Sequence, residues 1–472
     1  MYDLERLHPA AVIENLIRNI YKFFQILIGP LVIIATSPLS KRWLVIIAIV
    51  GLGAYFLISI LSWYRFRYAV YNEELRIEYG ILARRKTYIP IERIQSMQIT
   101  TGIVQRIFGL VKVDVQTAGG SSEAKASLSA ITKEQASKLQ AQLNIIKHST
   151  DMNEKISVIK NKKHLTLKTL LIAATTSNGI GVVLVGGLAV LSQINQHLPN
   201  EDIYTKIGES IINYAGDTVW IYLLSLLFIL ILAWILSIIG TIISIGGFTI
   251  SRLEDRLLVQ RGLIEKREIS IPLNKIQAIK IVEGILRQPF GLATIQVVSA
   301  GIGSKSTNDT IAFPLLAKKE IPNFLAEFLP EYKTEITYTP LAKAAQNRYR
   351  LILTIPTLLA VIPILCFFNY GFLALLIAVL AWFWGKKQYK DAGINIEEEQ
   401  IAIRYRLIGL NTYLIKHSKI QAIKLKQNPF QKRKNIKAIE VYIASSRAGS
   451  TVGLTGIKSS KGDEILNWYR EF

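Results

Sequence analysis

The chain has 472 residues, of which 50% are hydrophobic, and its formal net charge is +22 at pH 7. The mean hydropathy is positive, +0.32, which indicates a membrane protein rather than a soluble one. The single cysteine, Cys366, excludes an intramolecular disulfide and a metal cluster built from cysteines.

Five long runs carry no charged residue, and a membrane-spanning helix needs about 20 such residues. The runs cover residues 23–40, 43–64, 169–200, 218–251 and 351–385. As one straight helix the last run would be about 52 Å long, which is too long for the hydrocarbon core. We therefore predict that it forms two helices that turn at residues 369–371, with Pro356 and Pro363 bending the first. The sequence predicts six crossings in three pairs.

Basic residues gather on one side of these predicted helices. Lys and Arg flank the outer ends of each pair, whereas the loop at residues 195–217 carries four acidic residues against Lys206 alone. Because cytoplasmic loops are rich in Lys and Arg, we expect a multi-pass plasma-membrane protein with both termini in the cytoplasm. Lys41 and Arg42, between the first two crossings, are an exception to this sorting. Nucleic-acid binding would also suit a basic chain, but sorting by side favours the membrane interpretation, so we expect no nucleic-acid partner.

A module with strand-like and helical segments follows each predicted helix pair. In the first, residues 68–71, 75–79, 86–91, 94–99 and 111–117 have the character of short strands, and residues 131–145 have helical spacing. The predicted fold class is an α+β membrane protein, with each helix pair followed by a small twisted β-sheet or barrel capped by a C-terminal helix. The predicted division is 1–64 for the N-terminal segment and first pair, 65–146 for module 1, 147–245 for a linker and the second pair, 246–330 for module 2, 331–387 for a linker and the third pair, and 388–472 for module 3.

The modules are internal repeats of one another. Gly80 and Gly262 are 182 residues apart, and so are Pro90 and Pro272. A third, looser copy includes residues 415–422. The two glycines are expected to permit a turn with positive φ, and each proline is expected to end a strand or mark a sheet edge.

Four stretches of the repeat carry a resemblance to a known family. They are Gly-Ile/Leu-x-x-Arg/Lys-Arg, Ile-Pro-x-x-Arg/Lys-Ile-Gln-Ser/Ala, the segments Gln-Arg-Ile-Phe-Gly-Leu and Arg-Gln-Pro-Phe-Gly-Leu, and a strand that ends in Ala-Gly. With them the chain resembles the bacterial pleckstrin-homology-like membrane proteins, and over almost its whole length their multi-domain, YdbT-like members. The resemblance implies pleckstrin-homology-like (PH-like) modules and a hetero-complex with a shorter relative that carries a single module. It implies no particular activity, because fold and function are separate questions.

Two sets of equivalent residues recur in all three copies. One set is polar and consists of Gln95, Gln277 and Gln421. These side chains either line a shared ligand or peptide groove or, as we favour, satisfy backbone groups where the strand turns. The other set is aromatic and is predicted to anchor the core: Phe108, Phe290 and Phe430.

Basic residues follow the two recurring glycine turns, and they also cluster in the third module. Attraction to an anionic leaflet is on the order of 1 kcal/mol per basic residue near its surface, so membrane lipid is one expected partner. A solvated rim is the alternative. The candidate contacts for lipid or a protein partner are Arg84, Arg85, Lys86, Lys266, Arg267, Lys432, Arg433 and Lys434.

One polar cluster interrupts the apolar runs: Thr175, Thr176, Ser177 and Asn178. Small and polar residues pack membrane helices against one another, which is the favoured interpretation, and a permeation path is the alternative. The chain lacks a phosphate-binding Gly-x-x-x-x-Gly-Lys-Ser/Thr loop, a His-Glu-x-x-His pair and a Gly-x-Ser-x-Gly elbow. We expect no enzyme, no cofactor and no metal site.

The sequence therefore predicts a non-enzymatic membrane protein that presents three cytoplasmic docking modules to protein partners or anionic lipid. The alternative is a component of a transport, export or envelope-defence complex that handles a lipid or a membrane-active peptide.

Overall fold

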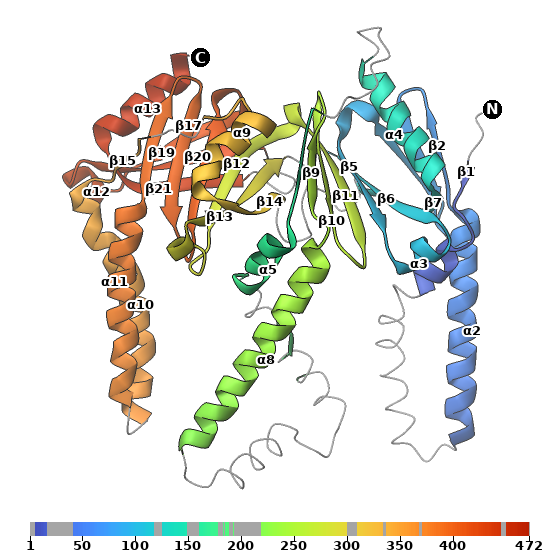
Figure 1. Cartoon of the computed structure of the whole chain (residues 1–472), viewed down its shortest axis with the longest axis horizontal. Helices are drawn as coiled ribbons and strands as arrows, with labels where there is room; N and C mark the ends of the chain where they lie inside the picture. Colours follow the sequence, from blue (N-terminus) through green and yellow to red (C-terminus); the bar gives the residue numbers. More distant parts are fainter. Residues whose placement is uncertain are drawn as a thin grey trace.

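Three β-rich modules lie in a row along the longest axis of a computed structural model, and long helices extend from them to one side (Figure 1). The structure describes residues 5–16, 41–117, 125–148, 160–177, 183, 185–187, 192, 219–299, 309–333, 337–367, 371–444 and 450–471. The common direction of the helices places all three modules on the same side of a membrane that the helices would enter.

Module 1 contains two small antiparallel sheets closed by a C-terminal helix. The first sheet has the order β1-β2-β3-β4, and β5, β6 and β7 follow one another in the second. The elements are β1 (Glu5–Arg6), α2 (Lys41–Arg65), β2 (Arg67–Tyr71), β3 (Glu74–Tyr79), β4 (Arg85–Pro90), β5 (Ile94–Thr101), α3 (Ile103–Ile107), β6 (Leu110–Thr117), β7 (Lys125–Thr132) and α4 (Lys133–His148).

Module 2 repeats this order of strands. Its elements are β8 (Asn161–His164), α5 (Leu167–Thr175), α8 (Val219–Ile245), β9 (Thr249–Arg252), β10 (Arg256–Arg261), β11 (Lys266–Pro272), β12 (Ile276–Glu283), η4 (Gln288–Phe290), β13 (Leu292–Ser299), β14 (Asp309–Ala317) and α9 (Ile321–Phe328).

Module 3 has the same plan, with a short helix in place of η4. Its elements are β15 (Thr339–Pro340), α10 (Gln346–Phe367), η7 (Gly371–Ala374), α11 (Leu375–Asp391), β16 (Gly393–Glu397), β17 (Gln400–Arg406), β18 (Leu410–Lys416), β19 (Ile420–Lys426), α12 (Pro429–Arg433), β20 (Ile436–Ile443), β21 (Ser450–Lys458) and α13 (Ser459–Glu471).

The first strand of each module precedes the membrane helices instead of following them. β1 pairs with β2, β8 with β9, and β15 with β16. The segments 147–245 and 331–387, expected to combine linkers with helix pairs, thus also supply a strand to the following module. These strands are short and polar, for example Asn-Lys-Lys-His in β8, so they lack the apolar alternation that marks a strand in sequence.

The modules are joined because the sheets continue from one into the next. The first seven-stranded sheet has the order β7-β6-β5-β11-β10-β9-β8, and the second β14-β13-β12-β18-β17-β16-β15. Met97 faces Ser270 at the first junction, and the equivalent residues Ile279 and Leu414 face each other at the second. The two junctions therefore share one register.

The second junction also joins the hydrophobic cores of its two modules. Ala402 and Leu414 of module 3 pack in the core of module 2. Ala278 and Val298 of module 2 pack in the core of module 3. Each module thus completes part of its neighbour's interior.

The phenylalanines that recur in the three copies do not anchor these cores, which corrects that prediction. Phe108, Phe290 and Phe430 are 45%, 71% and 75% exposed. The core of module 2 is instead built on Phe248, Phe313, Phe324 and Phe328, whose rings lie 4.8–5.7 Å apart in successive pairs.

Two helices in the described part of the chain are long and apolar enough to cross a membrane, Leu226–Ile245 and Lys343–Cys366, and a shorter apolar helix is Ile49–Arg65. The last uncharged run is divided into α10, which contains Pro356 and Pro363, and α11. The expected crossing at 23–40 and most of the one at 169–200 lie outside the described residues. Six crossings therefore stay a prediction.

The glycine turns have the predicted geometry. Gly80 has φ +113° and Gly262 has φ +100°. A Cβ added at Gly262 would lie 2.1 Å from the carbonyl oxygen of Glu265, and one at Gly80 equally close to that of Ala83. Glycine is required at both turns by backbone conformation and by space.

Gly262→Ala should lower the free energy of unfolding by about 1–3 kcal/mol, because the turn must either shift or keep a strained conformation. Gly240→Ala is the matched control, because a Cβ at this helical position in α8 would meet nothing within 4 Å. Thermal unfolding in mild detergent should show a lower Tm for the first variant only. An equal Tm for both variants would contradict the strain argument.

Candidate membrane-facing surface

Each module exposes large apolar side chains in two loops. We call the loop between the third and fourth strands of a module its first tip. We call the loop between the fifth and sixth strands its second tip. First-tip residues are Leu82 in module 1, Leu263 and Ile264 in module 2, and Leu407 and Ile408 in module 3. Second-tip residues are Ile103, Ile107 and Phe108 in module 1, Ile285, Leu286 and Phe290 in module 2, and Phe430 in module 3.

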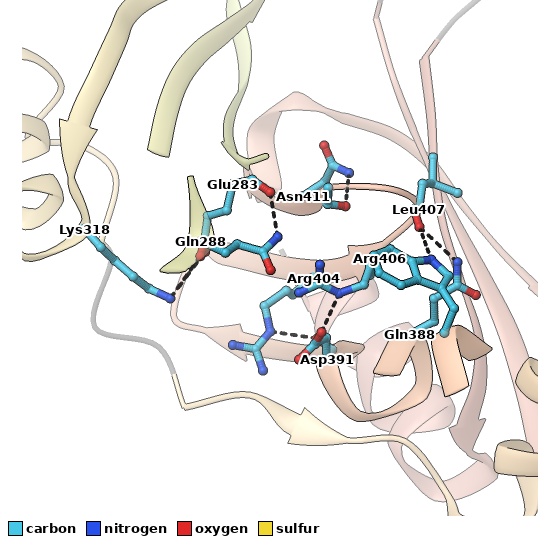
Figure 2. Close-up of polar contacts among 11 residues, drawn as sticks. Glu283, Gln288, Lys318, Gln388, Asp391, Arg404, Arg406, Leu407 and Asn411 are labelled. Carbon is cyan, nitrogen blue, oxygen red and sulfur yellow. Dashed lines mark hydrogen bonds and ion pairs between the residues drawn. The ribbon is translucent and has the colours of Figure 1, made fainter. Parts of the chain in front are cut away.

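The first tips lie against the module ends of apolar helices. The amide of Leu263 donates to the carbonyl of Ile243 in α8 at 2.9 Å. In module 3, Trp384 Nε1 and Gln388 Nε2, both from α11, donate to the carbonyl of Leu407 at 3.0 and 3.1 Å. The contact with Gln388 is drawn in Figure 2. The tips therefore lie where these helices would leave the hydrocarbon core.

Neighbouring modules bring their tips together. Arg106 in α3 donates to the carbonyls of Leu263 and Ile264 at 3.2 and 2.9 Å. At the second junction, a Cβ on Gly409 would lie 3.0 Å from the carbonyl oxygen of Glu283. The second tip of one module thus adjoins the first tip of the next, and both junctions present a composite apolar patch.

A polar network fixes the first tip of module 3 in its place (Figure 2). Arg406 Nε contacts Asp391 Oδ2 at 2.5 Å, and Arg404 Nε donates to the carbonyl of Asp391 at 2.9 Å. On the side of module 2, Lys318 forms an ion pair with Glu283 at 3.3 Å. Because Arg406 is only 5% exposed, this pair holds β17 rigidly against α11.

The basic candidate residues flank the first tips in modules 1 and 2. Arg84 and Lys86 both pair with Glu78, at 2.6 and 3.5 Å. Arg267 pairs with Glu265 at 3.2 Å. Arg85 and Lys266 are exposed beside them. In module 1, one carboxylate is shared by two cations. In module 2, the paired Arg267 has beside it Lys266, which enters no described ion pair. Both turns therefore keep a positive charge.

The basic residues of module 3 lie on and after α12, next to a membrane helix. Lys432, Arg433 and Lys434 are exposed, and none of them enters an ion pair with the residues that the structure describes. Like Arg85 and Lys266, they are candidates whose charge no described ion pair compensates.

A groove of about 520 Å³ lies between α10 and α12. Its apolar lining comes from Leu351, Ile352, Ile355 and Pro356 of α10 and from Phe430. Arg348 and Lys434 also line it. This combination of an apolar wall and two cations suits one acyl chain and the anionic headgroup of the same lipid.

The three glutamines differ in their surroundings. Gln277 is 9% exposed, and its amide donates to the carbonyl of Lys275 at 3.1 Å. This is the backbone role that we favour for the set. Gln421 is exposed at the start of β19. Gln95 begins β5 in the same way, but its side chain lies outside the described residues.

The described side chains of the polar cluster at the end of α5 form hydrogen bonds within α5 or with α8. Thr175 and Thr176 donate to carbonyls one turn earlier in α5. Ser177 contacts Ser237 of α8 at 3.3 Å and accepts from Thr241 at 3.2 Å. Asn178 lies outside the described residues.

Arg287, which the sequence analysis did not single out, connects this cluster to module 2. It donates to Thr176 Oγ1 at 3.1 Å, to the carbonyls of Ala173 and Pro314 at 3.1 Å each, and to Thr294. Burial lowers the pKa of this guanidinium. It therefore acts as a clamp between α5 and the β-rich module. The only sequence signal is its place in the Arg-Gln-Pro-Phe-Gly-Leu segment.

Comparisons with known proteins agree with this architecture. Residues 23–145, 205–332 and 340–472 match the Bacterial PH domain family. The chain belongs to this family and contains three copies of its domain. It is 34% identical, over 99% of its length and 98% of the relative's, to the UPF0699 transmembrane protein YdbT of Bacillus subtilis (strain 168).

Arg287→Met should destabilise the protein by about 2–3 kcal/mol, because Thr176 and the carbonyls of Ala173 and Pro314 lose their donor. Arg267→Met is the control: an exposed ion pair contributes about 0–1 kcal/mol, so its Tm should change little. Thermal unfolding in mild detergent distinguishes the two. A Tm unchanged by Arg287→Met would show that the guanidinium does not clamp the helix.

Proposed function

We propose that the chain is a non-enzymatic, multi-pass scaffold of the cell membrane, with six crossings and with both termini in the cytoplasm. Its three modules would lie on the inner leaflet and present docking surfaces to anionic lipid and to a protein partner, a shorter relative with one module. The observation that carries the proposal is the placement of apolar tips beside the module ends of apolar helices.

The exposed tips are difficult to explain in water. Leu82, Ile107, Phe290, Ile408 and Phe430 are each more than 60% exposed, and burying such a side chain is favourable by about 1.5–3 kcal/mol. Contiguous apolar patches on a soluble surface normally mark an interaction site. A lipid interface at the ends of the helices would cover all of them at once.

Positive charge beside the tips strengthens the same contact. Each basic residue near an anionic surface adds on the order of 1 kcal/mol. Three modules on one chain also raise the local concentration of these weak contacts, so that they combine if the geometry lets them engage together. The row of modules in Figure 1, with the long helices α2, α8, α10 and α11 extending to one side, supports this part of the proposal.

We do not propose a permeation path at the polar cluster of α5. The hydroxyl groups of Thr175, Thr176 and Ser177 have partners within the helices or on Arg287. Their contacts are those of helix packing.

A fluorophore sensitive to polarity at Phe290→Cys should report insertion into the membrane. In a Cys366→Ser background reconstituted in nanodiscs, its emission should be blue-shifted and should be quenched by spin-labelled lipid. The shift should be larger with anionic than with zwitterionic lipid.

Glu254→Cys provides the control position for this measurement. Glu254 is exposed in the turn before β10, at the opposite end of that strand from Leu263. A fluorophore there should emit as in water. Equal emission and equal quenching at the two positions would rule out docking of the modules on the leaflet.

The groove between α10 and α12 should retain an anionic lipid. Replacing Arg348 and Lys434 together by Gln should reduce bound phosphatidylglycerol by about tenfold, since two cationic contacts are lost. Native mass spectrometry of the detergent-solubilised chain measures this directly. Lys461→Gln on α13 is the control and should retain the lipid. Equal retention by all three proteins would show that the groove does not recognise the headgroup.

A further inference from the structure

The row of modules ends in two open sheet edges. β11 and β18 pair with the preceding module, and their counterpart in module 1 is β4. β5 and β12 pair with the following module, and their counterpart in module 3 is β19. Among the residues that the structure describes, no strand pairs with the outer edge of β4 or of β19.

A comparison of equivalent residues in β12 and β19 shows that, within the described part of the chain, β19 lacks a neighbouring strand on its outer edge. In β12, Gln277 is 9% exposed and Ala278 is fully buried, because β18 covers that edge. Their counterparts in β19, Gln421 and Ala422, are exposed. Ala278 completes the core of the module that follows it. Ala422 therefore occupies the position from which a residue would enter the core of a fourth module.

We propose that the edge of β19 accepts the fourth strand of a further PH-like module, carried by a separate polypeptide. The row of three modules would then continue into a fourth through the same antiparallel pairing. This inference deepens the protein-partner part of the proposed function, and it relies on that function only for placing the fourth module on the same leaflet.

The two internal junctions fix the register of the proposed one. Gln98 faces Ile269 at the first junction, and Lys280 faces Tyr413 at the second. The equivalent position in β19 is Lys424, so Lys424 would face the corresponding residue of the partner strand. In β4 of this chain that residue is Thr87.

A lysine at this position does not prevent pairing. Lysines on edge strands often block unwanted association, which is the alternative explanation for Lys424. Lys280, however, lies in a strand paired on both sides, and its ammonium group is 5.5 Å from the centre of the Tyr413 ring. The edge of β19 is therefore compatible with a partner strand that offers an aromatic or neutral residue.

A second copy of this chain is a poor occupant for reasons of charge. In the shared register Lys426 of one copy would face Arg85 of the other, and like charges directly opposite each other are destabilising. The internal junctions avoid such a pair: Thr100 faces Arg267, and Val282 faces Asn411. The partner strand should carry a neutral or acidic residue where this chain has Arg85.

Photo-cross-linking of the full-length chain in its native membrane tests the partner. With a photoreactive amino acid at Lys424, we expect a product in which the cross-linked peptide lies in the fourth strand of a PH-like module on another polypeptide. The same amino acid at Glu254 should give about tenfold less product. Product no more abundant than at Glu254, or product with a second copy of this chain or a protein without such a module, overturns the proposal.

A defined probe tests the edge itself. Two full-length copies lacking Cys366 are mixed in one membrane, one with Lys424→Cys and the other with Thr87→Cys and Arg85→Glu. With copper phenanthroline as the oxidant, we expect a disulfide-linked dimer, and severalfold less of it when Arg85 is retained. The internal pair Gln98→Cys with Ile269→Cys should form an intrachain disulfide under the same conditions.

Tyr88→Cys in place of Thr87→Cys is the register control, since its side chain points to the other face, and it should give little dimer. Equal yields for Thr87 and Tyr88, or no dimer beside a normal internal cross-link, would refute edge pairing. Fluorescence at Phe290→Cys measures docking on the leaflet separately. Failure of edge pairing and failure of leaflet docking can therefore be distinguished.

Discussion

Antiparallel pairing between the second sheet of one module and the first sheet of the next determines the arrangement of the whole chain. An unpaired strand edge leaves a row of backbone donors and acceptors without partners, and the two junctions pair four such edges within the chain. Because Met97–Ser270 and Ile279–Leu414 are equivalent pairs, each module is related to the next by a similar step. That step keeps the long helices α2, α8, α10 and α11 on one side of the row (Figure 1).

Polar contacts also fix the modules on their apolar helices. A module joined to a helix only through one chain segment would be free to tilt relative to that helix. Here Arg287 ties α5 to module 2, and the Arg406–Asp391 pair with the contacts of Leu407 ties β17 to α11. A cation is suited to the first role, because several carbonyl and hydroxyl oxygens gather around one group. In modules 2 and 3, the orientation of the module relative to its helices is therefore set by polar contacts at the level of the tips.

The sequence was a good guide to local structure and a poor one to surfaces. The positive φ at Gly80 and Gly262 and the strands that end at Pro90 and Pro272 follow from turn and strand chemistry. The exposure of Phe108, Phe290 and Phe430 does not follow in this way, because a phenylalanine that recurs in each copy resembles a core residue unless a membrane is assumed. Periodicity shows that a strand has two faces but not that the second face packs against another module, so the junctions and the clamp at Arg287 were missed.

The two open ends of the row carry basic residues, Arg85 and Lys426, at positions that would face each other if identical chains paired. A head-to-tail interface between identical chains produces open filaments when its rotation does not close a ring. Lys426 at one end and Arg85 at the other would oppose that outcome, whereas the internal junctions place Thr100 and Val282 at the position of Lys426. Module 2 carries Arg267 at the position of Arg85, but Arg267 faces the neutral Thr100 of module 1, so this junction has no pair of like charges. The two edges of module 2 are covered within the chain, and selection of a partner is left to the terminal strands.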